Sequence, residues 1–446
     1  MAEDLSARLD DAVRLLRTFP PSTRVRIVSH YDADGIAAAA ILCRMLAREG
    51  YDFFATLLRN PFTKGFDRLM TEDDPLILFS DMGSGQLDSI EKLKGKSIIL
   101  DHHQPGAQAP SGRIVQVNAN LCGIDGNYAA CGATLSYLFA TMVNPANTDL
   151  VGLAVAGAIG DRQHMGGFQG INRDIVQGAM STGLVTEKTC IKLDGRTVSD
   201  ALFWSIDPYF LGLSGNKDAV AGLLQRLGIA ADTPVESLDG DALVRLQSSL
   251  VLACMKAGCI KEALDLMISP RFRSPGLPYD LERLADVVDA CGKSGHRGVG
   301  LAVCLGDGHM WTEAEAIERE YRGKVLSALA ALPGSMTERQ GLRYFISGDS
   351  SLGGMVAGIA AMYVCGSEKA LFALTRKDGE LHVSCRGNRD LVDRGLDLGA
   401  AMREVAGELG GHGGGHKIAA GATIALAREA EFLERVDRVL AGQVAR

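Results

Sequence analysis

The sequence predicts an α/β protein with a parallel-sheet domain first, a mostly helical middle segment and a smaller α/β domain at the end. Apolar runs of strand length alternate with helical stretches over residues 24–159, which is typical of a parallel sheet with right-handed crossovers. From about residue 200 the pattern becomes mostly helical, and strand-like runs return after Pro333. These observations predict four consecutive parts, over 1–198, 199–310, 311–332 and 333–446.

The elements of the first domain are predicted from short apolar or amphipathic runs. The stretch 4–18 has the pattern of an amphipathic helix. Apolar runs predict strands over 24–29, 51–58, 75–80, 96–100 and 113–117. Further helices are predicted over 35–48, 86–93, 130–142 and 149–159. The order of these elements is that of a sheet whose strands are joined by helices.

The later parts of the chain are predicted in the same way. The middle segment is expected to form helices over 217–227, 241–257 and 279–291. One long helix with a charged face is expected over 311–332, where it could connect two domains. The last domain is expected to contain strands over 342–346, 370–375 and 381–384, and a helix over 353–363.

Composition narrows the class of protein. A net charge of −8 over 446 residues argues against a uniformly basic nucleic-acid coat but leaves room for a local basic groove. No secretory signal and no run of membrane-spanning apolarity is recognised. Ten cysteines without a CxxC pair are typical of reduced thiols, not of disulfides or a zinc site. We therefore expect a cytoplasmic protein with no membrane association.

Acidic and imidazole side chains follow several apolar elements. They are concentrated in the stretch SHYDADG at 29–35 and in the Asp-His-His run that begins at Asp101. Ligands of open parallel sheets bind beyond the carboxyl ends of the strands, so these groups should meet at one edge. The candidate metal ligands are His30, Asp32, Asp34, Asp81, the run Asp101-His102-His103 and Asp161.

Carboxylates crowded at one edge repel each other and resist ionisation unless cations neutralise them. Mixed oxygen and nitrogen ligands suit Mn²⁺, Mg²⁺ or Zn²⁺, and an oxygen-rich set favours the harder ions. Six ligands suffice for two ions about 3.5 to 4 Å apart with one bridging carboxylate. Taken alone, Asp32 or Asp34 could instead be a turn residue or a helix N-cap. His164 could lie near the site, whereas His296 and His309 are expected to be ordinary surface or core residues.

Two stretches near the end of the chain suggest phosphate binding. The run GGHGGGH at 410–416 is predicted to be neither strand nor helix interior, and its backbone N–H groups could surround an anion. A flexible linker is the alternative. Ser384 and Arg386 share one face of a strand end, where an arginine fork could bind phosphate or could simply be a surface group. The GKS tripeptides at 95–97 and 292–294 lack the upstream glycine of a nucleotide-triphosphate loop.

Together these motifs resemble the DHH phosphoesterase superfamily, and more closely the RecJ-like single-strand nucleases, especially the archaeal ones. The resemblance rests on HxDxDG at 30–35, Asp81, Asp101-His102-His103, Gly160-Asp161 and GGHGGGHKIAAG at 410–421. It identifies 1–198 as the DHH domain and 333–446 as the DHH-associated substrate-binding domain. Residues 288–293 are similar to the Asn-Ala-Ala-Gly-Arg loop of RecJ proteins, with Asp289 and Lys293 replacing the asparagine and arginine.

The resemblance also implies roles for individual residues. One ion would be held by His30, Asp32 and Asp81, and the other by Asp34, Asp81, His102 and Asp161. His103 would face the scissile phosphate, and Asp101 would orient an imidazole. The residues implied to hold the phosphates of the terminal nucleotide are Ser384, Arg386, Gly413, Gly414, Gly415 and His416.

The leading hypothesis is therefore an exonuclease on single-stranded DNA or RNA that uses two divalent ions, Mn²⁺ before Mg²⁺. One alternative is a phosphodiesterase for short oligonucleotides or cyclic dinucleotides. Another is a subunit that binds a GINS-type replication complex. The sequence leaves open the polarity of digestion, the choice between DNA and RNA, and the oligomeric state.

Overall fold

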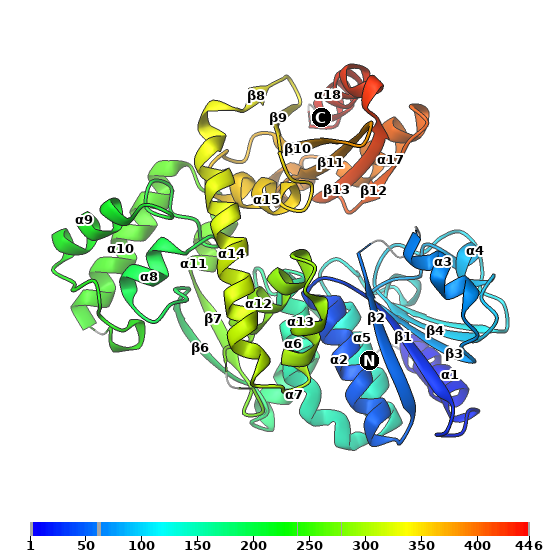
Figure 1. The fold of residues 1–446 in the computed structure, drawn as a ribbon. Coiled ribbons are helices and arrows are strands. Elements are labelled where there is room, and N and C mark those ends of the chain that lie inside the picture. The colour runs from blue at the N-terminus through cyan, green and yellow to red at the C-terminus, as the bar shows by residue number, and fades with distance from the viewer. Residues whose placement is uncertain (1–2, 60–63, 239, 278, 445–446) are drawn as a thin grey trace. The chain divides into compact units, whose positions relative to one another are not determined.

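A computed structural model of the chain describes residues 3–59, 64–238, 240–277 and 279–444, and its contacts divide the chain into two compact units (Figure 1). The first unit combines Met1–Thr189 with Pro270–Glu318, and the second combines Cys190–Ser269 with Arg319–Arg446. The predicted fold class is confirmed: a parallel sheet comes first, then a helical middle, then a second α/β part. None of the described helices is long and apolar enough to cross a lipid bilayer.

The first unit is built on a five-stranded sheet in the order β2-β1-β3-β4-β5, and every pair of neighbours is parallel. Its strands are β1 (Arg24–His30), β2 (Asp52–Leu58), β3 (Leu76–Ser80), β4 (Lys96–Asp101) and β5 (Ile114–Asn118). The chain adds β2 on one side of β1 and all later strands on the other. The strand order therefore reverses between β1 and β3, which is where ligands of such sheets bind.

Helices cover both faces of this sheet because side chains alternate along each strand. Ile27 and Leu78 point into a core shared with α1, α2 and α5, whereas Val28 and Phe79 belong to a second core with residues of α3 and α4. These helices are α1 (Glu3–Arg17), α2 (Ala33–Arg48), α3 (Lys64–Thr71), α4 (Leu87–Ile90) and α5 (Gly132–Val143).

Four further helices complete the first unit, namely α6 (Val151–Gly160), α7 (Gly170–Ser181), α12 (Leu281–Lys293) and α13 (Arg297–Cys304). The last two lie within the range expected for the middle segment, but α12 packs on α6 and α2, and α13 packs on α2. The cause is the apolar stripe of α12, because buried Leu281, Leu284 and Val288 join the core around α2. The observed division therefore differs from four consecutive parts. Helix α14 (Met310–Ala331), close to the expected connecting helix, passes from one unit to the other.

The second unit begins with a small helical core of its own. It contains α8 (Val198–Phe203), α9 (Lys217–Leu227), α10 (Gly240–Ala257) and α11 (Lys261–Met267). Buried Phe210, Leu246 and Leu250 form the centre of this core. The strands β6 (Thr186–Ile191) and β7 (Ile268–Arg273), which pair with each other, enter and leave this region.

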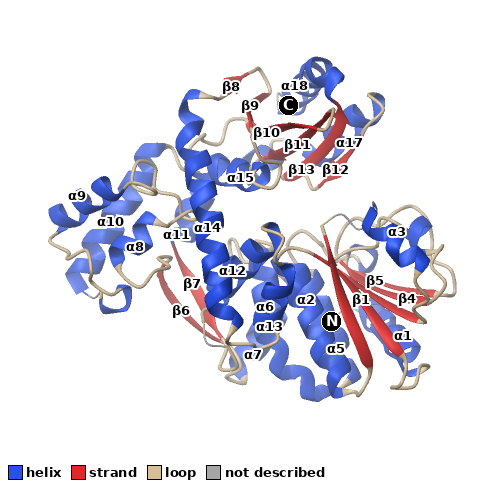
Figure 2. Cartoon of the chain, viewed as in Figure 1, coloured by secondary structure: helices blue, strands red, loops and turns tan. Residues whose placement is uncertain are grey.

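The rest of the second unit is a six-stranded sheet in the order β12-β13-β11-β10-β9-β8 (Figure 2). Its strands are β8 (Thr337–Glu338), β9 (Leu342–Ile346), β10 (Ala370–Lys377), β11 (Glu380–Arg386), β12 (His412–Gly415) and β13 (Ala419–Ala425). Only β9 and β10 run parallel. The helices are α15 (Gly353–Tyr363), α16 (Arg389–Asp393), α17 (Leu398–Glu408) and α18 (Glu429–Val444). The sheet and the helices α17 and α18 share one apolar core.

Candidate metal centre

The predicted ligands lie at the carboxyl edge of the first sheet, around the point where the strand order reverses. His30 ends β1, Asp81 directly follows β3, and His102 directly follows β4. Asp34 lies in the first turn of α2, and Asp161 is the C-cap of α6. Because β3 is the neighbour of both β1 and β4, Asp81 lies between the other strand-end groups.

Two sets of donor atoms form around Asp81. In the first set, Nδ1 of His30 lies 2.8 Å from Oδ2 of Asp32 and 3.4 Å from Oδ2 of Asp81. In the second set, Nε2 of His102 lies 3.1 Å from Oδ1 of Asp81, 3.5 Å from Asp161 and 3.9 Å from Asp34. The two oxygens of Asp81 thus face different sets, as a bridging carboxylate requires. The structure brings all six expected ligands together.

The backbone at Asp81 has an unusual conformation, with φ at 56°, a left-handed value that is uncommon for residues other than glycine. Its N–H donates to the carbonyl of Leu100 on the neighbouring strand β4. A Cβ at Gly132 would lie 2.5 Å from the Cβ of Asp81, so only glycine permits this approach. Strained backbone of this kind is concentrated at functional sites.

Asp34 is held by the first turn of α5. Its two carboxylate oxygens accept hydrogen bonds from the N–H groups of Gly132 at 2.7 Å and Ala133 at 2.9 Å. The side chain is 1% exposed, and a Cβ at Gly157 would lie 2.7 Å from Oδ1. Positive partial charge at the start of a helix stabilises a carboxylate placed there.

For Asp32 the N-cap interpretation is confirmed, and the same side chain also lies at the candidate metal centre. It is the N-cap of α2, and its Oδ1 accepts a hydrogen bond from the Gly35 N–H at 3.1 Å. Its other oxygen is the one that faces His30. A single side chain therefore ends the strand-to-helix turn and supplies a donor atom to the first set.

The Asp-His-His run fixes the orientation of its own imidazoles. Nδ1 of His102 lies beside the Gly126 carbonyl and donates to it, which leaves Nε2 turned towards Asp81. Asp101 accepts hydrogen bonds from the backbone N–H groups of Ser84 and His102, and from Nδ1 of His103 at 2.8 Å. The His103 ring is 42% exposed, so its Nε2 can reach a ligand.

Electrostatics shows why this cluster needs cations. Burial raises the pKa of the Asp34 carboxyl well above its usual range, and that of Asp161 also rises; the charge of Asp81 adds to both. Burial would lower the pKa of His102, but Asp161 and Asp81 outweigh it and raise that pKa well above its usual value. Both effects favour positive charge at this cluster, and divalent ions could supply it.

The geometry of the donors also fits metal binding. Nδ1 of His30 is buried and has no hydrogen-bond partner of ordinary geometry among the described residues, although Asp32 lies 2.8 Å away. Neighbouring ligands of an octahedral ion bound at about 2.1 Å lie about 3.0 Å apart, close to the spacing in both sets. Three groups of side chains within the described part of the chain could hold an ion: His30, Asp32 and Asp81; Asp34, His102 and Asp161; and Asp81 with residues 101–103.

Sequence reasoning missed the residues that support these ligands. Gln163 is buried, and its amide donates to Oδ2 of Asp161 and to the carbonyls of Gly126 and Ala130, each at 3.0 Å. Asn172 in turn donates to the Gln163 carbonyl. Neither residue belongs to a spaced motif, so the sequence carried no signal for them. His164 lies beside Phe168 and belongs to none of the three ligand groups, and His296 and His309 are exposed.

The second unit contains the predicted phosphate-binding residues on one sheet. Ser384 and Arg386 are half-buried and share a face of β11, opposite buried Val383 and Cys385. The first turns of α15 lie against this face, since a Cβ at Gly354 would lie 3.0 Å from Nη2 of Arg386 and 3.6 Å from Oγ of Ser384. The predicted pairing of Ser384 and Arg386 on one face is therefore confirmed.

The expectation that the glycine run cannot form a strand is wrong. Residues 412–415 form the edge strand β12, paired with β13. Gly413 is needed because α17 packs directly on the strand, where a Cβ would overlap the Met402 carbonyl oxygen. Gly414 pairs with Gly421, which pairs with Ser384, so these three residues share one face. The glycines thus form a stretch of sheet surface without side chains near Ser384, and they do not form a loop that surrounds an anion.

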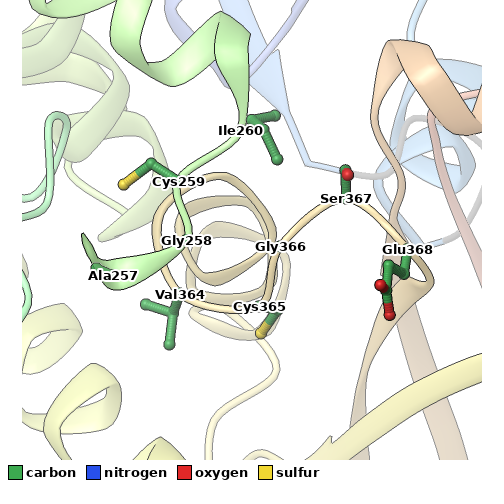
Figure 3. A pocket seen from close by; sticks show the side chains of 9 residues that line it. All are labelled: Ala257, Gly258, Cys259, Ile260, Val364, Cys365, Gly366, Ser367 and Glu368. Atoms are coloured by element: carbon green, nitrogen blue, oxygen red, sulfur yellow. The ribbon is translucent and has the colours of Figure 1, made fainter. Parts of the chain in front are cut away.

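The second unit also contains a pocket of about 430 Å³ between the α10–α11 and α15–β10 connections (Figure 3). Figure 3 shows Cys259 and Cys365 on the two different segments that line this pocket. Burial raises the pKa of the Cys365 thiol to about 11, so it is protonated at neutral pH. None of the predicted site residues lines this pocket.

Comparison with known proteins identifies two family domains in the chain. The DHH family N-terminal domain matches residues 24–158, and the DHHA1 domain matches residues 342–442. The chain is 30% identical over 429 residues to an uncharacterised protein of Methanocaldococcus jannaschii, covering 95% of this chain and 94% of that one. It is 27% identical over 178 residues to the single-stranded-DNA-specific exonuclease RecJ of Haemophilus influenzae, covering 34% of this chain and 31% of RecJ.

Solved structures show the same fold. RecJ from Thermus thermophilus in complex with Mn²⁺ matches with a TM-score of 0.59 at 19% identity, over 98% of this chain and 54% of RecJ. CDC45 from Entamoeba histolytica matches with a TM-score of 0.66 at 12% identity, over 97% of this chain and 98% of CDC45. The chain therefore spans about half the length of Thermus RecJ. Both family domains match, the candidate metal centre lies in the first of them, and one relative is similar along almost the whole chain. This protein therefore belongs to the DHH family and is RecJ-like.

Proposed function

We propose that this DHH-family protein is a metal-dependent phosphodiesterase that hydrolyses single-stranded DNA or RNA from an end. The observation that carries the proposal is the pair of donor sets that share Asp81, with one carboxylate oxygen facing each set. Relatives support the same interpretation, since the RecJ of Haemophilus influenzae is a single-stranded-DNA-specific exonuclease.

The first donor set would hold one divalent ion through His30, Asp32 and Asp81, and the second would hold another through Asp34, Asp81, His102 and Asp161. Bound ions of this kind lower the pKa of a water molecule and neutralise charge on a phosphoryl group. Mn²⁺ is the first choice and Mg²⁺ the second, because RecJ of Thermus thermophilus has been solved with each.

His103 would contact the phosphate directly, and Asp101 would act through His103 by orienting its imidazole. Burial and the neighbouring His102 would lower the pKa of His103, but Asp101 and Asp81 outweigh them and raise it. A protonated His103 that donates Nδ1–H to Asp101 still has an Nε2–H to donate to a phosphate oxygen. Asp101 accepts four hydrogen bonds, two of them from His103, and would hold that imidazole in place.

The second unit would bind the phosphates of the terminal nucleotide. Arg386 supplies a planar fork, Ser384 a hydroxyl, and Gly414 an open floor on the same face of the sheet. His416, which follows the edge strand, is the fourth expected contact. Gly413 would contribute by letting α17 approach, whereas Gly415 has φ at 133° and its side position meets Ala419 and Ala420 of β13.

Digestion of end-labelled strands tests the proposal. DNA and RNA single strands labelled at the 5′ or 3′ end should release labelled mononucleotides from one end with Mn²⁺, while a circular strand should stay intact. Equal cutting of circles and linear strands would exclude an exonuclease. A preference for strands shorter than about five nucleotides, or for cyclic dinucleotides, would favour the alternative substrate class.

A partner-binding role is the second candidate, supported by the similarity in fold to CDC45 along nearly the whole chain. The expected partner is a GINS-type replication complex. An Asp81→Asn protein should lose hydrolysis and still bind such a complex if both roles coexist. Loss of both properties together would argue that they are not separate.

A further inference from the structure

The junction between α12 and α13 lies directly beside the metal centre of the first unit. Gly292, near the end of α12, packs against the carbonyl of Tyr31, where any Cβ would overlap the oxygen. Tyr31 lies between the expected ligands His30 and Asp32, and its ring meets the His30 ring edge-on at 4.7 Å. Side chains at this junction are therefore held next to the candidate metal centre.

Arg297 is the first residue of α13 and is half-buried at this junction. Its guanidinium lies over the Tyr31 ring, 5.9 Å from the centroid, and its Nη1 donates to the Leu57 carbonyl at 3.1 Å. Its Nε is buried and has no hydrogen-bond partner in the described part of the chain. A second guanidinium, that of Arg59, lies 5.8 Å from the same ring.

The charge of Arg297 distinguishes it from its neighbour Lys293. Lys293 is paired with Asp289 one turn earlier on α12, so its charge is compensated. Within the ranges that the structure describes, Arg297 has no carboxylate partner; its guanidinium donates to a carbonyl and lies over an aromatic ring. A fixed cation with a buried unused donor, placed beside a carboxylate-rich centre, is suited to an anion that approaches the same edge.

We propose that Arg297 binds a phosphate next to the scissile one in the substrate strand, and that Tyr31 positions its guanidinium. This subsite deepens the proposed function and depends on it, because the anion is a second phosphodiester of the same strand. It would favour strands with at least two phosphates over substrates with one. Arg297 would thereby set the preference for chain length.

Arg297→Gln and Arg297→Lys should be compared with wild type and with Arg14→Gln, which removes an exposed arginine of α1 that pairs with Asp11. Two substrates are used with Mn²⁺: bis(p-nitrophenyl) phosphate, which has one phosphate, and a labelled 12-nucleotide DNA strand. For Arg297→Gln, KM for the strand should rise about tenfold with kcat unchanged, the expected loss for one charge-assisted contact. Turnover of the small ester should be unchanged.

Binding of the same strand in EDTA, followed by fluorescence anisotropy, supplies a readout that a structural role would not move. The slope of log affinity against log salt should fall by about 0.7 for Arg297→Gln and stay at the wild-type value for Arg297→Lys. An unchanged KM and salt slope, or an equal fall in turnover of the small ester, would overturn the subsite. If wild type neither binds nor cuts any strand, the proposed function fails first and the subsite fails with it.

Discussion

The candidate sites of the two units differ in the sign of the charge that they gather. The centre of the first unit gathers four carboxylates and two imidazoles, and two of the carboxylates, those of Asp34 and Asp81, are buried. The face around Ser384 in the second unit has one arginine, one hydroxyl and a glycine floor. The first site is therefore rich in negative charge, whereas the face in the second unit carries the positive charge of Arg386.

This difference determines how a substitution would affect each site. In the first unit a substitution acts through charge, because each ligand compensates others across neighbouring elements. In the second unit a substitution would act through steric overlap or through the loss of one contact. A Cβ added at Gly413 would overlap α17, whereas a Cβ added at Gly414 would meet nothing within 4 Å. Four experiments test this contrast.

Asp81→Asn should have the largest effect, since it removes the one carboxylate that faces both donor sets. We expect hydrolysis to fall about 10³-fold or more, equivalent to roughly 4 kcal/mol. Asparagine tolerates the left-handed backbone at this position, so folding should be preserved. Initial rates on a labelled strand and Mn²⁺ titration calorimetry check both points. Asp73→Asn, whose side chain is 81% exposed, is the control, and an active Asp81→Asn protein would contradict the shared-ligand geometry.

Mn²⁺ should stabilise the first unit more than the second. The chain has two tryptophans, Trp311 in the first unit and Trp204 in the second, so Trp204→Phe and Trp311→Phe leave one reporter for each. At a Mn²⁺ concentration 100 times its Kd, we expect about 2.7 kcal/mol of stabilisation in the first unit. Urea unfolding followed by fluorescence measures it. Equal stabilisation at both reporters would show that the units unfold together.

Gly413→Ala and Gly414→Ala form a matched pair on the edge strand. Gly413→Ala should lower the free energy of unfolding by about 2 kcal/mol, because the new methyl overlaps the Met402 carbonyl. Gly414→Ala should change it by less than about 0.5 kcal/mol, because its side position is open. It should instead weaken binding of a labelled strand. Equal destabilisation by both changes would mean that β12 does not pack on α17 as described.

Arg386→Gln should raise KM for a strand about tenfold, or roughly 1.4 kcal/mol, and leave Mn²⁺ affinity unchanged. Arg376→Gln on the neighbouring strand β10, which removes a bidentate pair with Glu429, is the control. Steady-state kinetics and calorimetry separate substrate from metal. A loss of Mn²⁺ affinity in Arg386→Gln would show that the two sites are not independent.

The parallel sheet and its acidic edge could be predicted because both depend on local pattern. Asp81 follows a short apolar run, and parallel strands bring such ends to one edge, so the sequence predicted its place beside His30. Gln163 could not be found in this way. Its partners include Gly126 and Ala130, which only the folded chain brings near it.

Other errors arose where a pattern has two physical causes. The glycine run was interpreted as a sign of backbone freedom, whereas Gly413 serves the close approach of a helix. The apolar stripe of α12 predicts burial but does not say in which core, and the helix joins the first unit. Local sequence determines that a side chain is buried, and tertiary contacts determine where.

The grip of α5 on Asp34 has a consequence for inherited or engineered changes far from the reaction. Gly132 and Gly157 leave no room for even one methyl group between the helices and this carboxylate. A larger residue in the surrounding core would push α5 or α6 outward and move the carboxylate oxygens of Asp34 away from the other candidate ligands. Such a variant would keep its secondary structure and a nearly normal melting temperature while losing turnover. A survey that measures stability alone would therefore not detect the loss of activity.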